Sequence, residues 1–155
     1  MTVSTGLYWD DSLIEPYPDS LGGKSLGLLR LKSCGLKVPR FCVLLPDADP
    51  ELAVEALKSF NGSPVAVRSS AEAEDGDLAS FAGMYETVLG VRTEDELRRA
   101  IAHCRSSARS ERLEAYRALH NLPESPLAII IQELVEGSEH GEVKTQGMLA
   151  ASRTC

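Results

Sequence analysis

The sequence predicts a mixed α/β domain of the α+β kind, folded around a mostly antiparallel sheet. Segments with a strand pattern alternate irregularly with segments of helical pattern, and a long acidic stretch interrupts them, which indicates a mixed architecture. The chain has 155 residues, of which 43% are hydrophobic and 25% are charged. This length and composition are typical of one globular domain with a buried core.

The first forty-five residues predict an N-terminal segment, a helix and a strand. Residues 1–20 are polar and contain prolines, so we expect them to lead into the domain without regular structure. Apolar residues at helical spacing predict a helix over 24–34, and Gly35 stands where a left-handed residue would end it. The apolar run at 41–45 predicts a buried strand.

A second helix and two further strands follow. Asp49 as N-cap and Pro50 at the first helical position predict where this helix begins. Residues 65–68 and 85–91 predict strands on either side of the acidic stretch. In the second of these strands alternate residues would share one face, and these are Tyr85, Thr87, Leu89 and Val91.

The last elements are two helices and a central strand. Thr93 and Glu96 form the pattern of a capping box, which predicts the start of a long helix. A second helical stretch follows over 113–119. The strongly apolar run at 127–132 is typical of a strand in the middle of a sheet.

Composition excludes several classes of function. A net charge of −7 opposes general nucleic-acid binding, so any phosphate site must be a local cationic pocket. No apolar run approaches the roughly 20 residues of a membrane span, and no signal peptide is recognisable, so we expect a cytoplasmic protein without membrane contact. The four cysteines and three histidines lack ligand spacing, so we expect reduced thiols and no metal ligands.

Arg68 ends a β-branched strand among small hydroxyl residues. A guanidinium in such a place suits planar recognition of phosphate oxygens. The alternative is an ordinary ion pair with one of the acidic residues that follow, and these are Glu72, Glu74 and Asp75.

The segment Gly22-Gly23-Lys24-Ser25 has the ending of a P-loop, but the motif also requires a glycine where this chain has Pro18. A different anion site remains open, because two glycines let backbone amides approach a phosphate at the start of a helix. Lys24 would then add a point charge. The alternative is a surface lysine placed unfavourably against the helix dipole.

Residues 65–87 read V-A-V-R-S-S-A-E-A-E-D-G-D-L-A-S-F-A-G-M-Y-E-T. This stretch resembles the signature V-A-V-R-S-S-A-x-x-E-D-x-x-x-A-S-F-A-G-x-x-x-T of the N-terminal ATP-binding domain shared by phosphoenolpyruvate synthase, pyruvate phosphate dikinase and rifampicin phosphotransferase. Residues 21–28 resemble that domain's opening G-G-K-x-x-x-L, and 130–135 resemble its V-V-Q-x-x-V strand. The resemblance covers about residues 21–136, in the family's order.

The resemblance implies an ATP-grasp-like fold, in which the nucleotide lies between two lobes. It implies phosphate contacts, and hence catalytic roles, for Lys24 and Arg68, with Gly22 and Gly23 beside the phosphates. The other nucleotide-binding residues that it implies are Gly83 and Thr87 in the bordering loop, Gln132 near the adenine, and the hinge Glu133, Leu134 and Val135. For Gly83 and Thr87 a tight turn and a cross-strand hydroxyl stay open as alternatives.

The resemblance also implies parts that this chain does not supply. In the family the Mg²⁺ ligands come from later in the same domain, a separate domain carries the phosphate-accepting histidine, and a third binds the acceptor. We therefore expect ATP as the nucleotide, Mg²⁺ held by residues outside this chain, and the missing domains as partners in cis or in trans. Residues 137–155 match the family only weakly and form a divergent tail.

Two functions stay open. The first is ATP or AMP binding, as the nucleotide-binding part of a dikinase-type phosphotransferase that does not turn over as this chain alone. The second is a non-catalytic fragment that acts through partner contacts. Intact Lys24 and Arg68 favour the first, and the missing metal-binding half favours the second. The acceptor could be pyruvate, an antibiotic or a glucan. We also expect the strand at 127–134 to expose an apolar face where the missing lobe would pack.

Overall fold

The computed structural model describes residues 6–18, 20–71, 86–121 and 126–135. Their strands form a five-stranded sheet in the order β1-β2-β5-β3-β4, and all four neighbouring pairs are antiparallel. The bounds are β1 Leu7–Trp9, β2 Phe41–Leu44, β3 Val65–Ala71, β4 Thr87–Val91 and β5 Leu127–Glu133. The prediction of an antiparallel sheet in a mixed helix and strand domain is confirmed.

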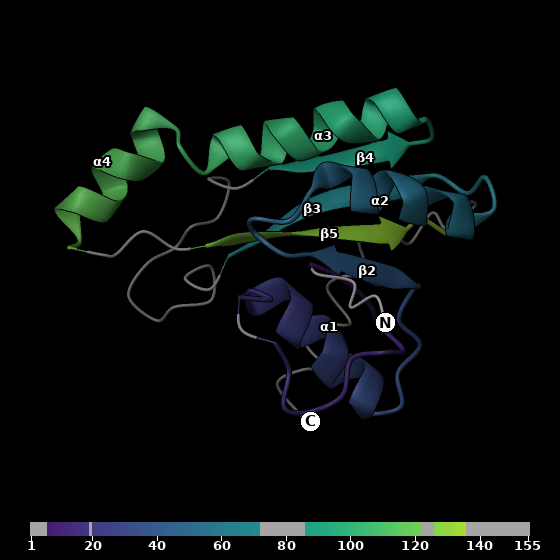
Figure 1. The fold of residues 1–155 in the computed structure, drawn as a ribbon. Coiled ribbons are helices and arrows are strands. Elements are labelled where there is room, and N and C mark those ends of the chain that lie inside the picture. Colours follow the sequence, from purple (N-terminus) through teal and green to yellow (C-terminus); the bar gives the residue numbers. More distant parts are fainter. Residues whose placement is uncertain (1–5, 19, 72–85, 122–125, 136–155) are drawn as a thin grey trace.

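Helices cover both faces of the sheet (Figure 1). The helix α1 (Gly23–Ser33) packs on one face, which we call the α1 face. The opposite face carries α2 (Pro50–Leu57), the short helix η1 (Lys58–Phe60), α3 (Glu94–Ser107) and α4 (Glu111–Leu119). Strand side chains alternate between the two cores, so each helix layer has its own set of buried residues.

The strand β5 lies at the centre of the sheet. Ile129 and Ile131 enter the core under α2 and α3, and Ala128 and Ile130 enter the core under α1. All four are fully buried. The expectation that this strand exposes an apolar face is therefore wrong, because neighbouring strands and two helix layers already cover it.

The alternation expected in β4 is broken by a β-bulge. Val65 pairs with Val91 and Val67 with Val88, so β4 has one residue more than β3 between these two pairs. Gly90 lies in this bulge, where its φ of +74° allows the irregular backbone. Val88 and Val91 therefore pack on the core side, and Leu89 is 68% exposed.

Local start and stop signals are confirmed at most helix ends. Gly35 is left-handed, with φ +84°, after α1. Asp49 caps α2 through the Glu51 amide, and Thr93 with Glu96 forms the capping box of α3. Three details differ: the N-terminal segment supplies β1, β3 runs on to Ala71, and Leu119 of α4 is 80% exposed.

The cysteines also differ in part from the expectation. Cys42 and Cys104 are free, and burial raises the pKa of their thiols to about 12 and about 11 respectively. Cys34 is disulfide-bonded. The expectation of reduced thiols is therefore wrong for Cys34.

Candidate functional site

The N-terminus of α1 packs directly onto β3. Gly22 is the N-cap residue, with φ +83°, and provides no side-chain cap. A Cβ added to Gly22 would lie 2.3 Å from both the carbonyl oxygen and the hydroxyl oxygen of Ser70. Glycine is therefore required here twice, by the backbone conformation and by the close approach of the two chain segments.

The hydroxyl of Ser70 replaces the missing cap. It donates a hydrogen bond to the Leu21 carbonyl at 2.9 Å, because that oxygen can only accept. It accepts from the backbone N–H and the hydroxyl of Ser25, both at 3.2 Å. Ser70 and Ser25 are fully buried. A residue of β3 therefore caps α1 and fixes its N-terminus against the strand.

Lys24 lies in the first turn of α1, which contains no acidic residue. Its Nζ donates to the Ser69 carbonyl at 3.1 Å, one residue from Arg68 along β3. A lysine at a helix N-terminus adds positive charge to the positive end of the helix dipole. The fold thus gathers positive potential where α1 meets β3.

Arg68 lies in the middle of β3 and is half-buried. Because strand residues alternate in direction, Arg68 projects from the same face as Ser70, which is the α1 face. Its Nη1 donates to Oε1 of Gln132 at 3.3 Å. The structure therefore places the Lys24 ammonium group beside the β3 residue that follows Arg68. It also places Gln132 in contact with Arg68.

Gln132 lies on β5 and is only 7% exposed. Its Nε2 donates to the Pro39 carbonyl at 3.1 Å, so both ends of its amide are bonded within the protein. In the ladder Gln132 is opposite Ala66, and Ile130 is opposite Arg68. The contact between Arg68 and Gln132 is thus a diagonal one, within reach of two long side chains.

The remaining predicted residues lie near these three. Thr87 pairs with Arg68 in the ladder and is exposed. The N–H groups of Glu133 and Leu134 donate to the carbonyls of Arg40 and Pro64, both at 2.9 Å, so the fold already uses these two hinge amides. Val135 is 56% exposed. Gly83, Glu72, Glu74 and Asp75 lie outside the described residues.

These groups follow the α1 face from one end of the strands to the other. Ala128 of β5 is opposite Ser70, which caps the N-terminus of α1, and Gln132 lies four residues further along β5. That separation is about 13 Å at ~3.3 Å per residue. Lys24 and the α1 N-terminus lie near Ser70, and Arg68 lies between Ser70 and Gln132. Cationic groups and a helix N-terminus placed in this way can bind phosphate oxygens.

Sequence reasoning missed the part played by Ser70 and Pro39. Ser70 is the second serine of V-R-S-S, and its signal was its place two residues after Arg68, on the same face of a strand. Pro39 lies between α1 and β2. Its carbonyl matters because it holds the Gln132 amide.

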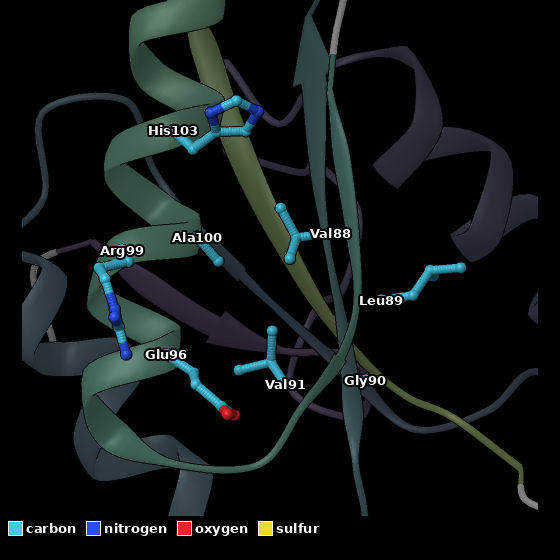
Figure 2. Close-up of a pocket in the computed structure, with 8 residues that line it drawn as sticks. All are labelled: Val88, Leu89, Gly90, Val91, Glu96, Arg99, Ala100 and His103. Atoms are coloured by element: carbon cyan, nitrogen blue, oxygen red, sulfur yellow. The ribbon is translucent and has the colours of Figure 1, made fainter.

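A shallow pocket of about 350 Å³ lies elsewhere, between β4 and α3 (Figure 2). Val88, Val91 and Ala100 provide its apolar surface, and Glu96, Arg99 and His103 also line it. It contains none of the predicted site residues. Glu96 is moreover already bonded to the backbone amides of Arg92 and Thr93. We therefore place the candidate site where α1 meets β3.

The described ranges lack two kinds of feature. No group of three or more histidine, cysteine, aspartate or glutamate side chains there could hold a metal ion. No helix there has the length and apolar character needed to cross a membrane.

Comparisons with known proteins show the family to which the chain belongs. Residues 46–149 match the family described as pyruvate phosphate dikinase, AMP/ATP-binding domain. The chain is 33% identical to the prodigiosin synthesizing transferase PigC of Serratia marcescens, over 90% of this chain and 19% of that protein. It is 32% identical to the rifampicin phosphotransferase of Streptomyces sviceus, over 72% of this chain and 13% of that protein.

A third relative is the phosphoenolpyruvate synthase of Deinococcus radiodurans, 40% identical over 55% of this chain and 11% of that protein. The chain therefore spans less than a fifth of the length of these three relatives. The family match includes Arg68 and Gln132, and the similarity to the Serratia protein extends over most of the chain. Because the family match covers more than half of the sequence, this chain belongs to the pyruvate phosphate dikinase AMP/ATP-binding domain family.

Proposed function

We propose that this chain binds ATP or AMP as the nucleotide-binding part of a dikinase-type phosphotransferase, with an ATP-grasp-like arrangement in the complete protein. The phosphates lie at Lys24, Arg68 and the N-terminus of α1. The adenine lies toward Thr87 and the hinge Glu133–Val135, and Gly83 borders the nucleotide. The observation that carries this proposal is the docking of the Gly22–Lys24 turn onto β3 beside Arg68.

The physical support is that the two cations can make different contacts with phosphate. Arg68 offers a planar fork of donors that can bond two phosphate oxygens at once. Lys24 adds a compact charge at a helix start where backbone N–H groups already point outward. Ser70 holds the α1 start against β3 before a ligand binds, so binding needs little further ordering of these two segments.

Phosphoryl transfer needs more than these residues. The described residues do not fit Mg²⁺, because they contain no group of three or more histidine, cysteine, aspartate or glutamate side chains that could hold a metal ion. We propose that the metal ligands, the phosphate-accepting histidine and the acceptor site belong to other parts of the complete protein. The chain alone is then a nucleotide-binding unit without turnover.

Isothermal titration calorimetry with ATP and with AMP tests the assignment. Arg68→Ala should weaken ATP binding about 10- to 100-fold, because it removes charge-assisted hydrogen bonds worth ~1.5–3 kcal/mol. Lys24→Ala should weaken ATP binding more than adenosine binding.

Arg98→Ala is the matched control. Arg98 is also a half-buried arginine, but it lies on α3, on the opposite face of the sheet, bonded to Glu51 and Asp95. Its removal should leave ATP affinity unchanged. Unchanged affinity in a folded Arg68→Ala variant, or equal losses in both arginine variants, would refute the proposed site.

A further inference from the structure

We propose that Gln132 is a positioning residue that holds the Arg68 guanidinium in place for phosphate. This inference rests on the proposed function. It differs from the role near the adenine that the resemblance implied for Gln132. The observation behind it is the pair of bonds from one buried amide, to Arg68 at 3.3 Å and to the Pro39 carbonyl at 3.1 Å.

Chemistry fixes which way this amide points. The Pro39 carbonyl can only accept a hydrogen bond, and the Arg68 guanidinium can only donate one. Only the orientation with Nε2 toward Pro39 and Oε1 toward Arg68 satisfies both groups. Pro39 therefore sets the direction of the Gln132 amide, and the amide in turn sets the direction of one arm of the guanidinium.

Burial makes this arrangement firm. Gln132 is 7% exposed, so water competes little for its amide, and a rotated amide would leave buried polar groups unpaired. The backbone on both sides is also fixed, because β5 is the central strand and β3 is its neighbour. The guanidinium is thus held between two strands that do not need to move when a ligand binds.

A neutral partner suits a residue that must bind an anion. Arg98 shows the contrasting case, since its Nε and Nη1 bond carboxylates of Glu51 and Asp95 at 2.8 and 3.0 Å. Those carboxylates compensate its charge within the protein. The bond from Gln132 to Arg68 supplies orientation without adding a negative charge.

The first test compares ATP with adenosine in calorimetry. Gln132→Met keeps the length of the side chain and removes its amide, and should weaken ATP binding about 3- to 10-fold with adenosine affinity unchanged. Gln132→Glu should weaken ATP binding more, because its carboxylate pairs with Arg68 and faces the Pro39 carbonyl. In an Arg68→Ala background neither change should weaken ATP binding further. Equal losses for ATP and adenosine would overturn the proposal, because they would place Gln132 against the base.

The second test needs no nucleotide. In the wild type, the arginine side-chain NMR signals of Arg68 should show hindered rotation about the Nε–Cζ bond, and in Gln132→Met this rotation should be faster. The Arg98 signals should stay unchanged in both proteins. Free rotation of Arg68 in the wild type would overturn the positioning role. Hindered rotation together with ATP binding that ignores Arg68 would instead refute only the proposed function.

Discussion

The helices α1 and α3 begin in opposite ways. At α3 the cap is local: Thr93 accepts from the Glu96 N–H at 3.2 Å, and Glu96 accepts from the Thr93 N–H at 3.1 Å. Its first turn is acidic, as the positive end of a helix dipole favours. At α1 the N-cap is a glycine, the first turn carries Lys24, and the capping hydroxyl comes from β3.

The difference separates a helix start that is capped by its own residues from one that is capped by a distant strand, where we propose the phosphate site. At α3 the protein's own carboxylates compensate the helix dipole, and nothing further is required. At α1 a lysine adds to the dipole, and the cap from Ser70 holds this positive end beside Arg68. The expected effects of mutations at the two helices therefore differ in kind as well as in size.

The largest expected effect comes from a mutation that breaks the contact between α1 and β3. Gly22→Ala forces a Cβ to within 2.3 Å of the Ser70 backbone and strains a residue at φ +83°, so it should cost about 3 kcal/mol or more. The matched control is Gly35→Ala, at φ +84° with no atom within 4 Å, which should cost about 1 kcal/mol. Urea unfolding measures both, and equal losses would contradict the close approach at Gly22.

The next effect compares the two caps. Ser70→Ala leaves the buried Leu21 carbonyl and Ser25 amide without their partner and should cost about 2 kcal/mol. ATP binding should weaken with it, because the Gly22–Lys24 turn loses its support. Thr93→Ala should cost about 1 kcal/mol and leave ATP affinity unchanged. The comparison would fail if Thr93→Ala weakened ATP binding as much as Ser70→Ala does.

The smallest effect concerns the pH dependence of the α3 cap. Hydrogen bonds from the Arg92 and Thr93 amides lower the pKa of Glu96 below 4.5. The stabilisation from this carboxylate is therefore present above pH 4.5 and is lost as the pH falls through the pKa of the folded state. The difference in unfolding free energy between wild type and Glu96→Gln should be constant near neutral pH and should shrink in acid. A difference that grew in acid would have the wrong sign.

The two helices also show what sequence reasoning could and could not predict. The start of α3 and the end of α1 were predictable because Thr93, Glu96 and Gly35 act within a few residues of their own positions. The cap of α1 was not, because Ser70 is 45 residues away from Ser25 along the chain. The bulge at Gly90 was missed for a related reason, since it exists only relative to the partner strand.

The same limit applies to the candidate site. Lys24 and Arg68 were predictable from residue type and resemblance, and the structure adds that Lys24 of α1 donates to the β3 carbonyl next to Arg68. The bond from Gln132 to Arg68 required the pairing of β3 with β5, and the orientation of its amide required the Pro39 carbonyl. Neither of these two contacts can be predicted from the local sequence pattern.

The most direct test of the α1 site is an NMR titration of the ¹⁵N-labelled chain with ATP. The proposed site predicts chemical-shift changes at Gly23, Lys24 and Arg68, with the amides of Glu94, Asp95 and Glu96 at the α3 start unmoved. Arg68→Ala should abolish the changes at Gly23 and Lys24. Shifts confined to Val88, Ala100 and His103 would instead place the nucleotide in the pocket between β4 and α3, and would contradict the assignment of the α1 N-terminus as the phosphate site.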